Sequence, residues 1–478
     1  MSSSKSTQKI LDQGFAFLGK AEFELAQKQF EQVLQREPRN FDAIHQLGTI
    51  ALQSKEWVKA LRFFDEAIAI NPHFADVHSN RSAVLHEVGR FEESLASADR
   101  AIAIDPRHVG AYCNRGVALR SLKRMDEAIG CCECAIQIDP HAVTPYFNRS
   151  IFSLLAGNFA QGWEGYEWRW HTANLKNKRY PFQQPQWLGH QSLKGKTILL
   201  QSEQGFGDTL QMCRYLPKVQ ALGARVVMDV PAALQPLLMQ LEGVARWVKL
   251  GETFPDFDYY CHFMSLPLAF ETRLETIPAT VPYLKADATK VAYWAKQLGE
   301  RMGEKKQKRV GLVWSGSTTH LNDHNRSLEF KNWLAYLPVG LDYVCLQKEL
   351  READRAILQT ASAQGLPTIR YFGDAIADFS DTAALCELMD VVISVDTSVA
   401  HLAGALGGKL WVLLPFVPDW RWLLDRTDSP WYPTATLYRQ PQPHDWNTVF
   451  QQITHDLQQL AEAPPLRLSW IQRLRRLM

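Results

Sequence analysis

The chain has 478 residues, enough for about three domains, and it carries a formal net charge of +1. So small a charge provides no overall field that would attract nucleic acid or an anionic membrane, and we expect neither as a partner. The opening residues, MSSSKSTQ, contain no apolar run typical of a signal peptide, and no later run is long enough to span a bilayer. We therefore expect a cytoplasmic protein without a transmembrane segment, whose 8 cysteines are free thiols.

A repeat of 34 residues runs through the first third of the chain. It is marked by prolines, which are Pro38, Pro72, Pro106 and Pro140. In the same frame, small residues return at two positions where a pair of antiparallel helices would approach closely. These residues are Gly14, Gly48 and Gly116 at one position, Ala26, Ala60 and Ala128 at the other, and Ser82 and Ser94 in the third repeat. Such a unit cannot bury its apolar face alone, so successive units must stack.

Over residues 7–142 this pattern resembles the tetratricopeptide repeat family, since several positions match in phase. The resemblance implies an all-α solenoid with four clear units. A fifth unit begins at Val143 and decays after Gly157. We place the whole repeat domain at residues 7–170.

Three asparagines stand at the sixth position of successive units, 34 residues apart: Asn80, Asn114 and Asn148. This part of the first helix lines the concave face of a tetratricopeptide superhelix, so the side chains would form a row. An amide offers a donor and an acceptor together, the pair that an extended peptide backbone requires. We predict that the row binds a protein or peptide acceptor. The alternative is that asparagine is simply common at this position in repeats that bind nothing.

A different pattern follows a linker at residues 180–185. Apolar runs typical of buried parallel strands alternate with helical stretches in two series, which the charged segment RMGEKKQK at 301–308 separates. The predicted strands are KTILLQSE, ARVVMDV, ARWVKL and DYYCHFM, then RVGLVW, DYVCLQ, TIRYF, DVVISV and KLWVLL. Each series predicts a doubly wound α/β lobe, at residues 186–300 and 309–460, followed by a basic helix at 461–478. Two such lobes facing one cleft favour the GT-B arrangement of nucleotide-sugar glycosyltransferases, although other two-lobed α/β enzymes fit the pattern.

The ends of two predicted strands carry polar residues, and ligands of α/β lobes bind at such ends. KTILLQSE runs into a tight turn, in which Gly205 and Gly207 would let the backbone approach and bind the donor and which would hold the carboxylate of Asp208 at the mouth of the cleft. An aspartate there could equally cap the helix that follows. DVVISV runs directly into Asp396 and a helix of small residues, LAGALGG, whose free N–H groups would receive a diphosphate.

Together these motifs resemble glycosyltransferase family 9, the ADP-heptose:lipopolysaccharide heptosyltransferases, over roughly residues 195–460. More closely, they resemble bacterial proteins in which such a region follows tetratricopeptide repeats. The resemblance rests on SEQGFGDTLQMCRYLP, VGLVWSGS, NDHNRS and SVDTSVAHLAGALGG. It implies that Asp208 is the general base of an inverting transfer, and that Asp396, Thr397 and His401 match the donor-binding motif. Ser398 replaces the usual glycine of the heptosyltransferases, so heptose is not implied as the sugar.

Further residues would complete the donor site of the second lobe. They are Ser315, Gly316, Ser317, Arg326, Gln347 and Lys348. Positive or dipolar groups there would stabilise a departing diphosphate. The serine and glycine turn could also be an ordinary turn, Arg326 a solvated loop charge, and Lys348 simply a surface lysine.

We predict no metal site and no cofactor, with the nucleotide sugar as a substrate. The Asp-x-Asp sequence at residues 256–258 has the form that holds a divalent cation in the other major glycosyltransferase architecture, but here it opens a predicted strand. We interpret it as a strand boundary, because a helix N-terminus can stabilise the leaving phosphate without a metal. Cys131, Cys132 and Cys134 suggest small-residue packing rather than zinc, since no histidine pair accompanies them.

Aromatic residues gather at two places. Trp163, Tyr166 and Trp170 have the spacing of one helical face, where we expect a hydrophobic seal between the solenoid and its neighbour. The aromatic residues at 420–422 and 431–432 are expected to pack in the core and between lobes, with stacking on a nucleotide base as the alternative.

The sequence therefore predicts a glycosyltransferase whose repeats present a protein or peptide acceptor. A second hypothesis is a repeat scaffold whose α/β part has lost catalysis and only binds partners or a nucleotide. A third is an O-GlcNAc transferase-like enzyme, which also joins such repeats to a GT-B region. The joint presence of Asp208, Asp396 and His401 favours an enzyme, since a decayed site would have no reason to keep all three.

Overall fold

The computed structural model describes residues 5–249, 251–299, 307–320, 322–361 and 365–463. By its internal contacts the chain forms two compact units. The repeat unit comprises Met1–Ala156 and Trp168–Ala173, and the α/β unit comprises Gly157–Glu167 and Asn174–Met478. The expected linker at 301–308 and the expected basic helix at 461–478 lie largely outside the described residues. Within the described ranges, no helix has the length and apolar character needed to cross a bilayer.

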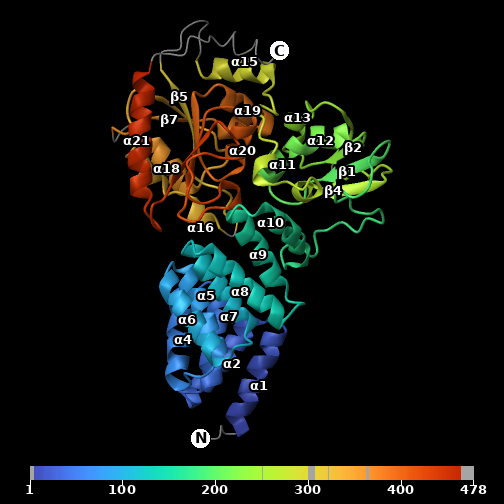
Figure 1. Ribbon diagram of the computed structural model, residues 1–478. Helices are drawn as coiled ribbons and strands as arrows, with labels where there is room; N and C mark the ends of the chain where they lie inside the picture. Colours follow the sequence, from blue (N-terminus) through green and yellow to red (C-terminus); the bar gives the residue numbers. More distant parts are fainter. Residues whose placement is uncertain (1–4, 250, 300–306, 321, 362–364, 464–478) are drawn as a thin grey trace. The chain divides into compact units, whose positions relative to one another are not determined.

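The repeat unit is built from helical hairpins stacked one on the next (Figure 1). Its helices are α1 (Lys5–Gly19), α2 (Phe23–Arg36), α3 (Phe41–Gln53), α4 (Trp57–Ile70), α5 (Ala75–Glu87), α6 (Phe91–Ile104), α7 (Val109–Ser121), α8 (Met125–Ile138) and α9 (Val143–Leu155). The first helices of successive hairpins begin at Phe41, Ala75, Val109 and Val143, which reproduces the 34-residue period of the sequence. The predicted all-α solenoid is confirmed.

The small residues of the repeats lie where the two helices of a hairpin meet. A Cβ added to Gly48 would lie 2.6 Å from the ring of Phe64, and one added to Gly14 would lie 2.6 Å from the ring of Phe30. In the third repeat, a pair of buried serines takes the place of the glycine and the alanine. The hydroxyls of Ser82 and Ser94 each donate to the other residue's carbonyl oxygen at 2.8 Å. Close helix packing therefore explains the period of small residues.

The α/β unit contains two parallel sheets. The strands of the first are β1 (Thr197–Gln201), β2 (Arg225–Asp229), β3 (Val244–Trp247) and β4 (Tyr259–His262), in the order β3-β2-β1-β4. The strands of the second are β5 (Arg309–Val313), β6 (Asp342–Cys345), β7 (Ile369–Tyr371), β8 (Val391–Val395), β9 (Leu410–Leu414) and β10 (Ala435–Arg439), in the order β10-β9-β8-β5-β6-β7. All neighbouring strands in both sheets are parallel. The two sheets define a first and a second lobe.

Strand order sets the place of a ligand in each sheet. From β5 and from β1 the chain proceeds first to one side and then returns to the other, so the order reverses between β5 and β8 and between β1 and β4. Ligands of open parallel sheets bind beyond the carboxyl ends of the strands at such reversals. The segments after β1, β5 and β8 are therefore the places to look for a site.

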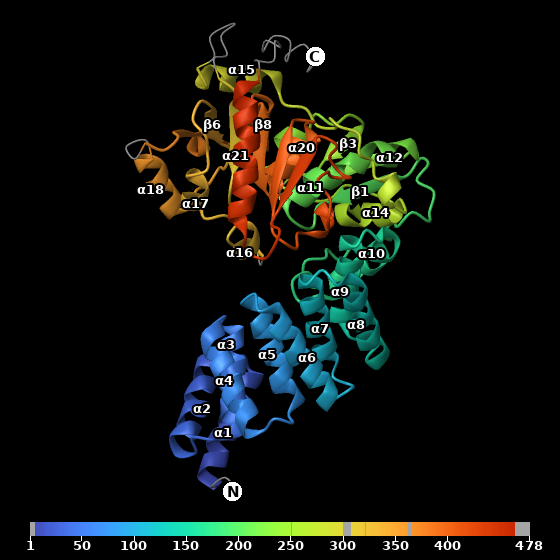
Figure 2. The same cartoon turned by 60° about the vertical axis from the view of Figure 1, so that its left-hand side comes forward.

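Helices connect and cover these strands (Figure 2). They are α10 (Phe159–Tyr166), α11 (Phe206–Met212), α12 (Leu216–Ala221), α13 (Gln235–Leu238), α14 (Leu266–Ala269), α15 (Ala288–Gln297), α16 (Asp323–Arg326), α17 (Phe330–Leu334), α18 (Glu352–Thr360), α19 (Phe379–Glu387), α20 (Ser398–Ala405) and α21 (Trp446–Glu462). The long helix α21 places Val449, Phe450 and Ile453 in the apolar core of the second lobe. That core also holds Val310 and Ile393, from the central strands β5 and β8.

The nine strands predicted from the sequence are all observed, and β10 is a further strand that the sequence analysis does not anticipate. The expectation for the aromatic residues near 163–170 needs a correction. Trp163 and Tyr166 lie on α10, which ends at Tyr166, and Trp170 follows in a 3-10 turn of the repeat unit. The three rings therefore do not share one helical face. Instead, Trp163 packs edge-on against Trp420, with ring centroids 5.0 Å apart, inside the α/β unit.

Candidate active site

Two short helices bring the ends of β1 and β8 together. Helix α11 follows β1, helix α20 follows β8, and the two helices pack against each other. Their contact depends on Gly207, because a Cβ there would lie 2.7 Å from Cδ2 of His401. This contact, called the junction below, unites residues that the sequence places in separate lobes.

Asp208 lies at the start of α11 and faces the second lobe. Its Oδ2 accepts a hydrogen bond of 2.7 Å from the backbone N–H of Gly205, the residue that precedes the helix. Its Oδ1 accepts from Nη2 of Arg421, which belongs to the second lobe. The side chain is 19% exposed. Asp208 thus caps its own helix, as one interpretation held, and also contacts the lobe that would bind the donor.

Arg421 is the buried cation at the centre of the junction. Its Nη1 donates to Asp419 at 2.8 Å and its Nε donates to the side-chain oxygen of Gln211 at 2.8 Å. Its guanidinium also lies over the ring of Trp420, 4.2 Å from the centroid. Burial disfavours the charge, but Asp419 and Asp208 outweigh it and raise the pKa of Arg421 above its ordinary value.

Asp396 is the first residue after β8. Its backbone carbonyl accepts from Nη1 of Arg326 at 2.8 Å, and its Oδ1 lies 3.8 Å from Nε2 of His401. Burial, together with the nearby charge of Asp419, raises the pKa of Asp396 to about 6. Because this pKa lies close to neutral, a small change in the surroundings of Asp396 would be enough to change the protonation state of its carboxyl.

Thr397 and Ser398 form the start of α20. The hydroxyl of Thr397 pairs with that of Ser394 at 3.1 Å and does not cap the helix. The first N–H groups of α20 are therefore not occupied by the Thr397 side chain, and they carry the partial positive charge of a helix N-terminus.

His401 lies one turn inside α20 and is buried. Its Nδ1 pairs with the hydroxyl of Tyr432 at 2.9 Å, and its ring stacks on that of Trp422 with centroids 5.5 Å apart. Burial, helped by Arg421, Arg214 and Arg326, holds the pKa of His401 well below its ordinary value. The imidazole is therefore neutral near pH 7 and acts as a packing and hydrogen-bonding group at the junction.

The segment after β5 carries the next group of predicted residues. Gln347, at the end of β6, accepts from the backbone N–H of Trp314 at 2.7 Å and donates to the hydroxyl of Ser315 at 3.0 Å. A Cβ on Gly316 would lie 2.6 Å from Nη2 of Arg326, so the guanidinium packs directly on this glycine. The structure thus brings Ser315, Gly316 and Arg326 beside the carbonyl of Asp396, at the reversal of strand order.

The two remaining donor candidates lie more openly. Ser317 is exposed and its hydroxyl pairs with that of Thr319 at 2.8 Å. Lys348 is exposed and donates to the carbonyl of Ala377 at 2.8 Å, so its ammonium group is already engaged by backbone.

Arg421 and Asp419 are not among the site residues predicted from the sequence. Residues 420–422 are expected to pack as aromatic residues, with stacking on a nucleotide base as the alternative, and the side chains of Trp420 and Trp422 are buried at 2% and 0% exposure. A nucleotide base could not stack on rings so enclosed. The available signal was the arginine itself, because an Arg inside an aromatic, apolar run must find buried partners for its charge.

Asp258 has a structural role at the far end of the first sheet. Its Oδ2 accepts from the backbone N–H of Thr197 at 2.8 Å, and its Oδ1 lies 3.0 Å from Nζ of Lys196. Strand β4 begins at the next residue, Tyr259. The interpretation of residues 256–258 as a strand boundary is confirmed.

Two asparagines of the predicted row form side-chain contacts with the preceding repeat of the solenoid. The Nδ2 atom of Asn114 donates to the carbonyl of Ser79 at 2.9 Å, and that of Asn80 lies 3.3 Å from Nε2 of His45. Both contacts reach back 35 residues, to the preceding repeat. Asn148 is half-buried on α9. The amide donors of two members therefore join neighbouring repeats.

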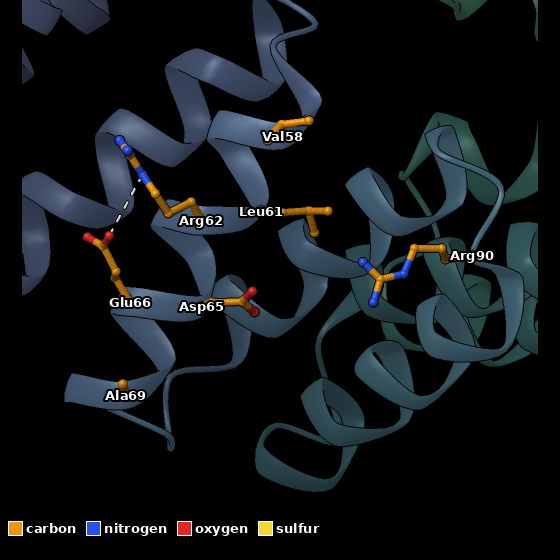
Figure 3. Close-up of a pocket in the computed structure, with 7 residues that line it drawn as sticks. All are labelled: Val58, Leu61, Arg62, Asp65, Glu66, Ala69 and Arg90. Carbon is orange, nitrogen blue, oxygen red and sulfur yellow. Dashed lines mark ion pairs between the residues drawn. The ribbon is translucent and has the colours of Figure 1, made fainter.

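An open hollow of about 650 Å³ lies elsewhere on the repeat unit (Figure 3). It is lined by Val58, Leu61, Arg62, Asp65, Glu66, Ala69 and Arg90. Its charges are partly paired within the protein, since Arg62 lies 3.8 Å from Glu66 and Arg81 donates to Asp65 at 2.7 Å. Val58 is 85% exposed, so an apolar patch remains at the surface.

The helical part of the chain is a tetratricopeptide repeat region. Models of the tetratricopeptide repeat match residues 17–83 and 109–142. They confirm the repeat and the resemblance of this helical region to the tetratricopeptide repeat family.

Among individual proteins, Protein FlbA of Caulobacter vibrioides is 27% identical over 333 residues, which are 64% of this chain and 54% of FlbA. The chain thus spans about half the length of this relative. Among solved structures, MamA matches at 19% identity and a TM-score of 0.31, over 38% of this chain and 99% of MamA. A thermophilic tetratricopeptide protein of Thermus thermophilus matches at 18% identity and a TM-score of 0.32, over 35% of this chain and 92% of its own.

Proposed function

We propose that the α/β unit is a glycosyltransferase of GT-B architecture that transfers a sugar from a nucleotide sugar to a protein or peptide. The observation that carries the proposal is the junction. There, the carboxylate of Asp208, after the first sheet, contacts Arg421 of the second lobe, and helix α11 packs against α20. Arg326 lies at the same end of the second sheet, where it donates to the carbonyl of Asp396 just before α20. A base and an anion receptor on opposite lobes are the two groups that sugar transfer requires.

In the proposed reaction, the acceptor hydroxyl oxygen attacks the anomeric carbon and gives its proton to Asp208. The bond from that carbon to the diphosphate oxygen breaks, and both of its electrons leave with the nucleoside diphosphate. Attack from the face opposite the leaving group inverts the configuration, in keeping with the resemblance to family 9.

The diphosphate would lie at the start of α20. The N–H groups after Thr397 would donate to its oxygens, and Arg326 would neutralise part of the charge that develops on departure. Because these groups suffice for the leaving group, we propose that transfer needs no metal and that the nucleotide sugar is the only small substrate.

The repeats would supply the acceptor. Tetratricopeptide stacks present long concave surfaces to other proteins. The carbonyl oxygens of Asn80, Asn114 and Asn148 could accept from the N–H groups of an extended peptide. The peptide acceptor is thus a proposal that rests on the repeat fold and the asparagine row.

The test is a panel of nucleotide sugars offered to the full chain, with thermal unfolding and release of nucleoside diphosphate as readouts. A true donor at 100 times its dissociation constant should add about 2.7 kcal/mol to the free energy of unfolding. A donor that stabilises the protein and is also turned over supports the proposal. The absence of both effects for every sugar in the panel would refute it.

The second hypothesis, a scaffold that binds a nucleotide without catalysis, is favoured by one observation. Both carboxylate oxygens of Asp208 already have partners, Gly205 and Arg421. Stabilisation by nucleoside diphosphates together with no turnover of any sugar would select this alternative.

A further inference from the structure

Arg421 links the two lobes at the proposed base. From its position in the second lobe it reaches three groups of the first: the carboxylate of Asp208, the side-chain oxygen of Gln211 and, at 3.9 Å, the sulfur of Met264. Its own lobe supplies Asp419 and the face of Trp420. A guanidinium has a rigid fork of donors, so these contacts fix its orientation and, through it, that of Asp208.

The charge balance shows what this arrangement does. Asp419 alone would neutralise a buried arginine, yet a second carboxylate approaches the same guanidinium from the opposite lobe. The guanidinium therefore holds the carboxylate of Asp208 in place from across the lobes.

We infer that Arg421 is a positioning residue, which holds the carboxylate of Asp208 in its orientation and so makes the proposed base depend on contact between the lobes. This inference rests on the proposed function. Arg421 acts through its contact with Asp208. One oxygen of Asp208 is held by the guanidinium and the other by the backbone N–H of Gly205, so the lone pairs that remain have a fixed direction.

A second buried arginine provides a matched control. Arg214 also crosses the junction: it donates to the carbonyl of Trp431 at 2.7 Å, to the carbonyl of Gln211 at 2.8 Å and to the hydroxyl of Tyr283 at 2.9 Å. Within the described part of the chain its partners are carbonyl, hydroxyl and ring groups, and none is a carboxylate. Arg214 therefore shares the role of joining the lobes and lacks the contact with the base.

The experiment compares Arg421→Met, Arg421→Lys and Arg214→Met in the full chain, with the nucleotide sugar that the wild type turns over fastest. For Arg421→Met we expect kcat to fall by about 10- to 100-fold while KM changes little, because a misplaced base impairs turnover more than donor binding. Arg421→Lys should also lower kcat, because it keeps the charge and loses the fork.

Arg214→Met should lower the melting temperature and lower kcat by much less than Arg421→Met does. An equal fall of kcat in Arg214→Met and Arg421→Met would assign the effect to lobe contact in general and overturn the inference. Wild-type kcat in Arg421→Met would overturn it directly. If Arg421→Met does not fold, Arg421→Lys decides: wild-type kcat in that variant contradicts positioning by the fork. A wild type that turns over no sugar refutes the proposed function, and the inference falls with it.

A readout without any donor checks the pair itself. Melting temperatures of Arg421→Met, Asp208→Asn and the double variant form a cycle. Arg421→Met alone leaves a carboxylate facing the junction unpaired, so adding Asp208→Asn should recover part of the lost stability. Strictly additive effects would show that the two side chains do not interact, and would overturn the inference even if the enzyme is active.

Discussion

Two neighbouring side chains after β8, Asp396 and His401, are both pushed by burial toward their uncharged forms. The pKa of the carboxyl is raised to about 6, whereas that of the imidazole is lowered. Only 3.8 Å separates Oδ1 of Asp396 from Nε2 of His401. A neutral imidazole can serve there as a hydrogen-bond partner. It would add no fixed positive charge at the position where we propose that a diphosphate binds.

The pKa of Asp396 predicts a pH-dependent effect of Asp396→Asn. A carboxyl whose folded-state pKa, about 6, lies above its unfolded value of 3.8 binds more protons in the folded state, so its ionisation destabilises the fold as pH rises through 6. The amide cannot ionise. We expect Asp396→Asn to melt at a higher temperature relative to the wild type at about pH 7.5 than at about pH 4.5. Thermal scans at both pH values measure the difference, and the opposite sign would contradict the assignment.

Asp208→Asn tests the proposed base. The amide keeps the shape of the side chain and loses its basicity, so turnover should fall by about 10²- to 10⁴-fold. Donor affinity, measured by calorimetry, should change by no more than about twofold, since the proposed diphosphate site is on the other lobe. The matched control is Asp258→Asn, which removes a paired aspartate at the amino end of the first sheet. Near-wild-type turnover by Asp208→Asn would remove Asp208 from the mechanism.

At the scale of elements, helix contacts depend on what a single Cβ would meet. Gly48 on α3 and Gly130 on α8 are both inside helices of the repeat unit. A methyl group on Gly48 would press into the buried ring of Phe64 at 2.6 Å, whereas one on Gly130 would meet nothing within 4 Å. Comparing alanine substitutions at the two glycines therefore separates the effect of helix propensity from the effect of packing.

We expect Gly48→Ala to destabilise the repeat unit by about 1–3 kcal/mol, because a close-packed helix pair must open or strain. Gly130→Ala should stabilise it by up to about 1 kcal/mol, since alanine is the better helix former. Chemical unfolding followed by circular dichroism measures both. A stabilising Gly48→Ala would show that the Phe64 ring moves aside freely and that the repeat period has another cause.

At the scale of the whole molecule, the proposed function needs both units, one to bind the acceptor and one to transfer the sugar. Changing Asn80, Asn114 and Asn148 together to alanine should lower transfer to a protein acceptor while hydrolysis of the donor continues. Stability should also fall, by about 1 kcal/mol for each lost hydrogen bond between repeats. The measurements are product formation with and without acceptor, and the melting temperature. Undiminished transfer to protein would mean that the acceptor enters by another route.

The sequence was informative wherever a pattern is local. A 34-residue period of small residues predicted helix pairs, and short apolar runs predicted β1 to β9, because each pattern reflects which face of one element is buried. β10 was missed, since ATLYR is short and contains no continuous apolar run like those of the other buried strands. The end of α10 at Tyr166, which separates Trp170 from Trp163, was missed for a related reason: helical spacing alone does not say where a helix stops.

In the candidate site too, some features follow from the sequence and others only from the tertiary structure. By itself the sequence determined the repeat solenoid, the strands of two parallel sheets and the strand-end positions of Asp208 and Asp396, because all of these follow from burial along a few consecutive residues. Only the tertiary structure decided that Asp208 meets Arg421, 213 residues away, and that His401 is enclosed by Tyr432 and Trp422. The pairing of buried charges depends on how whole lobes pack, and no local period records which distant carboxylate a buried arginine will find.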